Sequence, residues 1–231
     1  MAEVSEGTAM KHFKNESREY REARDRLLRS EIALREQVEA VARERRNLPM
    51  GGRVAEDYTF EEMAPDGSVR PVKLSELFGP GKDSLILYSY MYGPNMKTPC
   101  TSCTSIIDGL NASAPHVTQR SNLVIVAKSP IQRIMEFARG RGWNKIRIVS
   151  SSKNTYNKDY FAEDEKESQM PMANVFVKKD GAIHHFWGSE LLYVKNQGGD
   201  QRHVDMIWPL WNLFDMTPEG RGKDWYPKLS Y

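Results

Sequence analysis

The stretch Pro99-Cys100-Thr101-Ser102-Cys103 contains both cysteines of this 231-residue chain, two residues apart. Residues 84–92 precede it with an apolar run that predicts a buried strand, and residues 104–110 follow it with a sequence compatible with a helix. A C-x-x-C pair between a strand and a helix is typical of a dithiol–disulfide redox site. We therefore predict that the chemistry of the protein lies at this junction.

The two cysteines are expected to have different roles. A helix N-terminus lowers the pKa of a thiol through its unpaired N–H groups and its dipole. Cys100 falls at or just before such an N-terminus, and Cys103 falls one turn into the helix. We predict that Cys100 is the exposed, reactive thiol and that Cys103 is shielded but close enough to attack a mixed disulfide formed by Cys100.

Composition limits the class of protein. Hydrophobic residues make up 39% of the chain and the net charge is +2, an ordinary balance for a protein with a core. The near-neutral charge argues against a nucleic-acid partner, and no apolar run is long enough for a membrane span. Because the first residues lack the basic and apolar regions of a secretory signal, we expect a cytoplasmic protein, in which a structural disulfide is disfavoured.

Three other roles for the cysteines remain open. A zinc site usually needs four ligands, and His116 is the only histidine near the pair in sequence. The cysteines could also be small, inert core residues, or form a disulfide between chains. The chain has no Gly-rich phosphate loop, no H-E-x-x-H motif and no Ser/His/Asp set, so we expect neither a metal nor a cofactor.

The N-terminal part of the chain predicts a long amphipathic helix over about residues 10–47, which Pro49 ends. Glu and Arg alternate along it, which favours a helix packed on the domain or on a second subunit over one that binds membranes or nucleic acid. Its apolar stripe recurs every seven residues at Phe13, Tyr20, Leu27, Leu34 and Val41.

The rest of the chain alternates strands and helices. A hairpin around residues 65–68 precedes the C-x-x-C unit. Strands at 122–127 and 146–149 flank a helix that starts near Pro130, and a polar loop or lid follows at 150–169. A second hairpin turns at Asp180-Gly181. This order predicts a mostly parallel sheet to which the last hairpin adds antiparallel strands.

We expect three parts: a helical extension at 1–50, a main domain at 51–200, and a C-terminal helix with an irregular tail at 201–231, packed on the domain. Met170 and Pro171 precede the last hairpin and are candidate substrate-binding residues, because this junction can lie beside the dithiol. An ordinary trans Pro171 is the better interpretation. His184 and His185 should point to opposite faces of a strand, so we assign them structural roles.

The order of elements from Gly79 to Gly188 resembles the thioredoxin fold. More closely, the chain resembles a family of uncharacterised bacterial thioredoxin-like proteins, known as a domain of unknown function. The matching pieces are Glu44-Arg45-Arg46-Asn47-Leu48-Pro49, Tyr58-Thr59-Phe60, Leu77-Phe78-Gly79, Tyr90-Met91-Tyr92-Gly93-Pro94, the C-x-x-C pair, Val149-Ser150-Ser151 and Asp215-Met216-Thr217-Pro218-Glu219-Gly220-Arg221.

This resemblance implies an α/β fold with a thioredoxin-like central sheet flanked by helices. It implies that Cys100 attacks, that Cys103 resolves, and that Pro171 lies near the position of the cis-proline of that superfamily, although its spacing to Gly181 is longer than usual. The chain departs from thioredoxins in having Thr101-Ser102 between its cysteines and no tryptophan directly before them.

The expected function is thiol–disulfide exchange with a protein or small-molecule disulfide. A peroxiredoxin-like thiol peroxidase is the alternative enzyme: the pattern of Pro94, Thr98 and Cys100 resembles the peroxidatic motif, but it is one residue short and the arginine expected near residues 169–172 is missing. A non-enzymatic interaction module is the third alternative. A homodimer through the N-terminal helix or the C-terminal tail is a further expectation.

Overall fold

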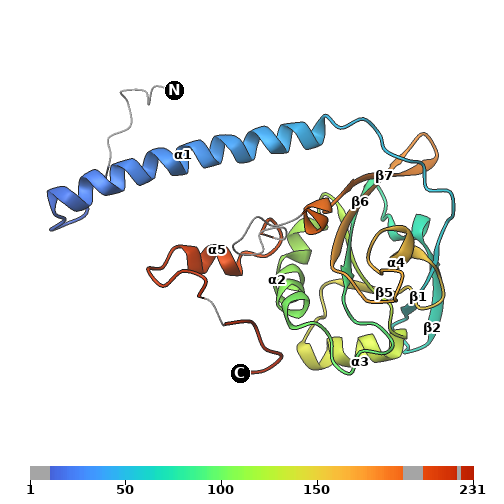
Figure 1. The fold of residues 1–231 in the computed structure, drawn as a ribbon. Coiled ribbons are helices and arrows are strands. Elements are labelled where there is room, and N and C mark those ends of the chain that lie inside the picture. Colours follow the sequence, from blue (N-terminus) through green and yellow to red (C-terminus); the bar gives the residue numbers. More distant parts are fainter. Residues whose placement is uncertain (1–10, 195–204, 223–224) are drawn as a thin grey trace. The chain divides into compact units, whose positions relative to one another are not determined.

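The computed structural model describes residues 11–194, 205–222 and 225–231, and its contacts divide the chain into one unit that ends at Leu48 and one that begins at Pro49. The first unit contains the long helix α1 (Arg18–Arg46) (Figure 1). This helix begins later than residue 10 because Asn15 adopts a positive φ of 64° and Ser17, in extended conformation, caps the helix by accepting a hydrogen bond from the Tyr20 N–H. No residue of α1 is buried.

The second unit is built on one seven-stranded sheet with the order β2-β1-β5-β4-β3-β6-β7. Only two of its six neighbouring pairs, β3–β4 and β4–β5, are parallel, so the expectation of a mostly parallel sheet is wrong. The reason is that the first hairpin joins the sheet, with β1 antiparallel to β5, and that β6 runs antiparallel to β3. The strands are β1 (Thr59–Met63), β2 (Val69–Lys73), β3 (Ser84–Tyr90), β4 (Asn122–Ala127), β5 (Arg147–Ser150), β6 (Met172–Lys179) and β7 (Ala182–Gly188).

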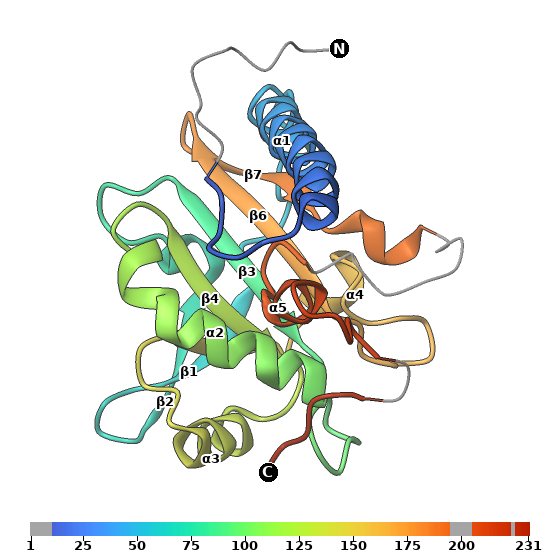
Figure 2. The ribbon, with the colours of Figure 1, turned by 90° about the vertical axis from the view of Figure 1, so that its left-hand side faces the viewer.

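Two helices cover one face of the sheet. These are α2 (Thr101–Val117), which follows β3, and α3 (Ile131–Arg141), which follows β4, and both contribute to one core cluster; in Figure 2, α2 crosses in front of the strands and α3 lies below it. Alternate residues of β3 point to opposite faces, so Tyr88 and Tyr90 pack under α2 whereas Leu85 and Leu87 pack in a second cluster behind the sheet. The sheet is therefore buried on both faces, as its apolar strands predict.

The last hairpin, β6–β7, turns at Asp180 and Gly181, which both have positive φ values, of 51° and 76°. This conformation is the one that an Asp-Gly turn favours. The subset β4-β3-β6-β7, with the C-x-x-C helix after β3, is the thioredoxin-like arrangement, and it confirms the predicted fold class.

Short helices complete the second unit. The predicted loop 150–169 contains one of them, α4 (Tyr156–Asp159), because Tyr156 is buried against Phe60 and Phe176 and anchors a single turn there. Two 3-10 turns lie at η1 (Leu74–Leu77) and η2 (Glu190–Tyr193). No helix in the described part of the chain has the length and apolar character that crossing a membrane requires.

The C-terminal segment is attached to the α2 face. Helix α5 (Leu210–Asp215) begins after Pro209, as the proline predicts. The Trp208 indole N–H donates to the Ser105 hydroxyl of α2 at 3.1 Å, and the Arg141 guanidinium donates to the Leu229 carbonyl at 2.6 Å. The boundary expected at residues 200 and 201 lies outside the described residues.

Candidate dithiol site

Cys100 is the N-cap residue of α2, and Cys103 lies within its first turn. The Cys100 backbone is extended, and its thiol sulfur accepts the Cys103 N–H at a donor–acceptor distance of 3.5 Å. The Cys100 side chain is partly exposed, whereas Cys103 is 1% exposed in the core beneath the helix. The sequence thus correctly predicted which thiol meets solvent and which is shielded.

The surroundings of the two thiols separate their acidities. The Cys103 thiol and the N–H groups of Cys103 and Ser102 donate to the Cys100 sulfur and lower its pKa to about 6, against the opposing effect of partial burial. The pKa of Cys103 is raised well above its ordinary value by its bond to Cys100 and by burial. Cys100 is therefore a thiolate at neutral pH and Cys103 is a protonated thiol.

Two consecutive hydrogen bonds through side-chain hydroxyl groups connect the first turn of α2 to the sheet. The Thr104 hydroxyl donates to the Cys100 carbonyl at 2.8 Å. Since a threonine has only one hydroxyl proton, the Tyr90 hydroxyl of β3 must be the donor in its 2.8 Å bond to Thr104. Both Tyr90 and Thr104 are buried, so this contact orients Cys100 from inside the core.

Arg133 of α3 fixes the loop at residues 93–97 that leads into the cysteines. Its guanidinium donates to the carbonyls of Gly93, Pro94 and Lys97 at 3.4, 3.1 and 3.2 Å, and also to that of Met96. It also lies 4.4 Å from the centre of the Tyr92 ring. One cation therefore holds four carbonyls of the loop, which a shorter or single-donor side chain could not do.

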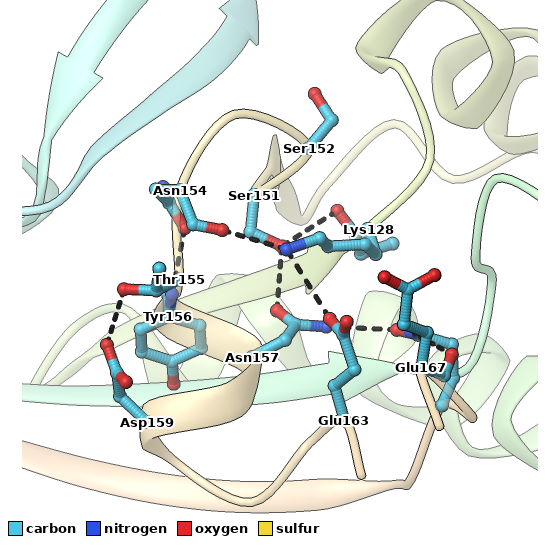
Figure 3. Close-up of polar contacts among 12 residues, drawn as sticks. Lys128, Ser151, Ser152, Asn154, Thr155, Tyr156, Asn157, Asp159, Glu163 and Glu167 are labelled. Atoms are coloured by element: carbon cyan, nitrogen blue, oxygen red, sulfur yellow. Dashed lines mark hydrogen bonds and ion pairs between the residues drawn. The ribbon is translucent and has the colours of Figure 1, made fainter. Parts of the chain in front are cut away.

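A cavity of about 480 Å³ adjoins this loop, and a polar cluster lies at its side (Figure 3). The Lys128 ammonium, at the end of β4, donates to the Asn154 carbonyl at 2.8 Å and lies 3.4 Å from the Glu163 carboxylate. The Asn157 side chain donates to that of Gln169, another residue of the wall, at 3.1 Å. Buried polar groups joined in this way give the cavity a fixed wall.

The structure places Met170 and Pro171 directly before β6. Since Ser89 pairs with Met172, Pro171 lies beside the end of β3, and its peptide bond is trans. The Met170 N–H bonds to the Ala162 carbonyl, and its side chain lines a second cavity. No hydrogen bond joins either residue to Cys100 or Cys103 in the described part of the chain, so their role in substrate binding stays a prediction.

The two histidines of β7 have separate partners. His184 bonds to the Gly51 carbonyl at 3.2 Å, and His185 bonds to the Asn174 side chain at 2.8 Å. Burial lowers the pKa of His185. Among the described residues no three His, Cys, Asp or Glu side chains gather as a metal site.

Sequence reasoning missed Arg133, Thr104, Tyr90 and the pair formed by Lys128 and Glu163. Thr104 carried a weak signal, since it lies four residues after Cys100 on the predicted helix. Arg133 and Lys128 carried none, because their partners are distant in sequence and meet them only after the sheet forms.

Comparison with solved structures finds peroxiredoxins at low sequence identity. A reduced 2-Cys peroxiredoxin from Plasmodium vivax is 18% identical, with a TM-score of 0.46 over 73% of this chain and 98% of that one. The mitochondrial 2-Cys peroxiredoxin from Plasmodium falciparum is 14% identical, with a TM-score of 0.47 over 72% and 95%. Peroxidoxin BcpB from Mycobacterium tuberculosis is 19% identical, with a TM-score of 0.44 over 71% and 96%.

Comparison with curated proteins finds none that matches this chain. A family model does match it, over residues 10–231, and therefore across nearly all of the sequence. The chain belongs to the family described as "Bacterial protein of unknown function (DUF899)".

Proposed function

We propose that the protein is a thiol–disulfide oxidoreductase that uses Cys100 and Cys103. The observation that carries the proposal is the pairing of a partly exposed Cys100, whose pKa is lowered to about 6, with a buried Cys103, whose pKa is raised. A thiolate attacks a disulfide, and a second thiol within one helical turn releases the product. Two inert core cysteines would not differ in this way.

The exchange proceeds in two balanced steps. The Cys100 thiolate attacks one sulfur of a substrate disulfide, forms a new S–S bond, and expels the other half of the substrate as a thiolate that takes up a proton. Cys103 then loses its proton and attacks the Cys100 sulfur, which frees the second half and leaves a Cys100–Cys103 disulfide. The substrate gains two electrons and the protein dithiol loses them.

Exchange fits these residues better than peroxide reduction. The groups that lower the pKa of Cys100 are the Cys103 thiol and backbone N–H groups, and no cationic side chain among the described residues contributes. The Arg133 guanidinium, which holds the loop before Cys100, is occupied by four carbonyls. Without a cation at the sulfur, a developing charge on a departing peroxide oxygen gains little stabilisation.

The test is to trap the first intermediate. A Cys103→Ser variant is mixed with a small disulfide, or with hydrogen peroxide, at pH 7, and the adducts are identified by mass spectrometry. We expect a stable mixed disulfide on Cys100 that forms far faster than on an unfolded chain. Fast sulfenic acid formation with peroxide, and slow reaction with disulfides, would establish the peroxidase instead; no accelerated reaction with either would leave an interaction module.

We extend the proposal to location and assembly. The proposed reaction suits the cytoplasm, where glutathione and thioredoxin keep thiols reduced. A second copy is proposed to pair along α1, because Tyr20, Leu27 and Leu34 recur every seven residues and are 50%, 52% and 65% exposed. Sedimentation equilibrium of the whole chain and of a Leu27→Glu/Leu34→Glu variant tests this pairing, since the variant should be monomeric.

A further inference from the structure

The cavity of about 480 Å³ lies at the carboxyl ends of β3 and β4, and the loop that leads into Cys100 forms part of its wall. Its wall includes Met91 and Met96 from the loop before the cysteines, Lys128 after β4, and Glu163 from the segment that leads to β6. The Met91 carbonyl accepts the Cys100 N–H at 3.1 Å. One wall residue is therefore bonded directly to Cys100, and this edge of an α/β sheet is where ligands commonly bind.

Two pairs of oppositely charged side chains line the cavity, one pair buried and the other exposed. Lys128 and Glu163 lie in its inner wall, with side chains 16% and 3% exposed. Lys158 and Glu167 are exposed at its edge, and both line the same cavity. Figure 3 shows the Lys128 side chain extending toward Glu163. The four formal charges cancel, so the cavity favours neither a simple anion nor a simple cation.

The inner carboxylate is under-bonded. The Glu163 Oε2 atom is buried, and it has no hydrogen-bond donor in the described part of the chain; its partner is the Lys128 ammonium at the long distance of 3.4 Å. A buried carboxylate oxygen without a donor is costly. A ligand ammonium group that entered the cavity would supply that donor.

The remaining wall suits an apolar, sulfur-containing group. Met91, Met96 and Pro94 line the cavity, and the two methionines pack against the same apolar core cluster as Cys100. Methionine side chains are flexible and polarizable, so they adapt to irregular ligands. Gln169 contacts the same loop at Gly93, where an added Cβ would lie 2.9 Å from the Gln169 side chain, so the two segments approach closely only because residue 93 is glycine.

We propose that this cavity binds low-molecular-weight disulfides that carry both an ammonium and a carboxylate group, and presents them to Cys100. The ammonium groups lie at Glu163 and Glu167, the carboxylates at Lys158 and Lys128, and the disulfide faces Met91 and Cys100. This assignment rests on the proposed function and names its substrate class. The reaction is the two-step exchange above, in which one disulfide yields two thiols and the protein dithiol becomes a disulfide.

The experiment compares four small disulfides with the full-length Cys103→Ser variant, in which the reaction stops at the mixed disulfide. The probes are cystine (zwitterionic), bis(2-hydroxyethyl) disulfide (neutral), cystamine (cationic) and dithiodipropionate (anionic). Each rate is divided by the rate of the same disulfide with a peptide of residues 98–104 carrying Cys103→Ser, which removes differences between leaving groups. We expect the normalised rate for cystine to exceed that for the neutral disulfide about tenfold, which the two ion pairs at the exposed Lys158 and Glu167 would already allow.

Two double variants test the exposed pair at the edge of the cavity, Lys158 and Glu167. Lys158→Gln combined with Glu167→Gln should lower the cystine rate about tenfold and leave the neutral disulfide within twofold. The matched control is Lys166→Gln combined with Glu165→Gln, on the same segment but outside this cavity, which should change neither rate.

The outcomes separate this assignment from the proposed function. Normalised rates that are all well above that of the peptide but equal among the four disulfides, or that favour the cation or the anion, overturn the zwitterion site and leave thiol–disulfide exchange standing. Equal loss of all four rates in the edge variant also overturns it. Rates no higher than the peptide's for every disulfide overturn the proposed function itself, and the substrate assignment with it.

Discussion

Helices α1 and α2 both have an apolar face, but only α2 buries residues of that face. The longer helix, α1, has 29 residues and buries none of them, whereas α2 has 17 residues and buries five, including Cys103 and Ile107. Both carry apolar residues at helical spacing. The difference is that α2 is preceded and followed by strands of one sheet, so its apolar face has the sheet to pack on.

This contrast indicates where the chemistry can reside. A thiol pKa is perturbed by fixed donors and by burial, and both need a helix that is held in place. Helix α2 is held by Tyr90, by Trp208 and by its own buried face. Helix α1 offers charged side chains in water, where ion pairs contribute little.

The largest expected difference between the two helices is in activity. Cys100→Ser should lower the rate of disulfide reduction by about a thousandfold or more, since the attacking atom is removed. Leu34→Ser in α1 should leave the rate within about twofold. Single-turnover release of thiol from a small disulfide measures both, and an equal loss in the two variants would break the comparison.

The second largest expected difference is in how substitutions in the two helices affect stability. Ile107→Ala should lower the free energy of unfolding by about 2–5 kcal/mol, because Ile107 is fully buried and its loss leaves a cavity. Leu34→Ala lies in the first unit and should change the free energy of unfolding of the second unit by no more than about 0.5 kcal/mol. Urea unfolding followed by tryptophan fluorescence reports on the second unit alone, since all five tryptophans follow Pro49.

A smaller effect concerns the donor to the Cys100 sulfur. Cys103→Ala removes the thiol that does most to lower the pKa of Cys100, so that pKa should rise from about 6 toward its ordinary value. A rise of one unit lowers the alkylation rate at pH 5 about tenfold, because only the thiolate reacts. The rate increases with pH through the pKa in both proteins, and only its midpoint moves.

Alkylation with iodoacetamide between pH 4 and 10 measures that midpoint. Cys103→Ser is the matched control, since its hydroxyl can still donate, and its midpoint should stay closer to that of the native protein. Identical midpoints in all three proteins would assign the low pKa to the helix N-terminus alone.

The smallest effect concerns the loop before α2. Arg133→Gln should lower the exchange rate several-fold, to about tenfold at most, because the loop at residues 93–97 loses its anchor and Cys100 is less well positioned. Arg133→Lys should recover part of the rate, and Arg139→Gln, exposed on the same helix, should have no effect. An unchanged rate together with an unchanged Cys100 pKa in Arg133→Gln would show that Arg133 does not position Cys100.

The features that could be predicted from the sequence are those set by residues close together in the chain. Strand β4 could be placed at residues 122–127 because five apolar residues follow Asn122 in one run. The turn of α4 was missed because four residues carry no periodic signal, and Tyr156 is held by rings from distant strands. In the site, the partial exposure of Cys100 and the burial of Cys103 were predictable from their positions at the start of a helix. The Lys128–Glu163 ion pair was not, because it depends on how two loops meet in the folded protein.

The antiparallel pairing of β1 with β5 has a consequence for the order of folding. The hairpins β1–β2 and β6–β7 close short turns, so each can form early. Glu61 of β1 pairs with Ser150 of β5, far along the chain, and that closure depends on β3, β4 and β5 being assembled first. We expect the first hairpin to dock last, and its amide hydrogens to exchange through a partial opening that leaves the cysteine-bearing half of the sheet intact.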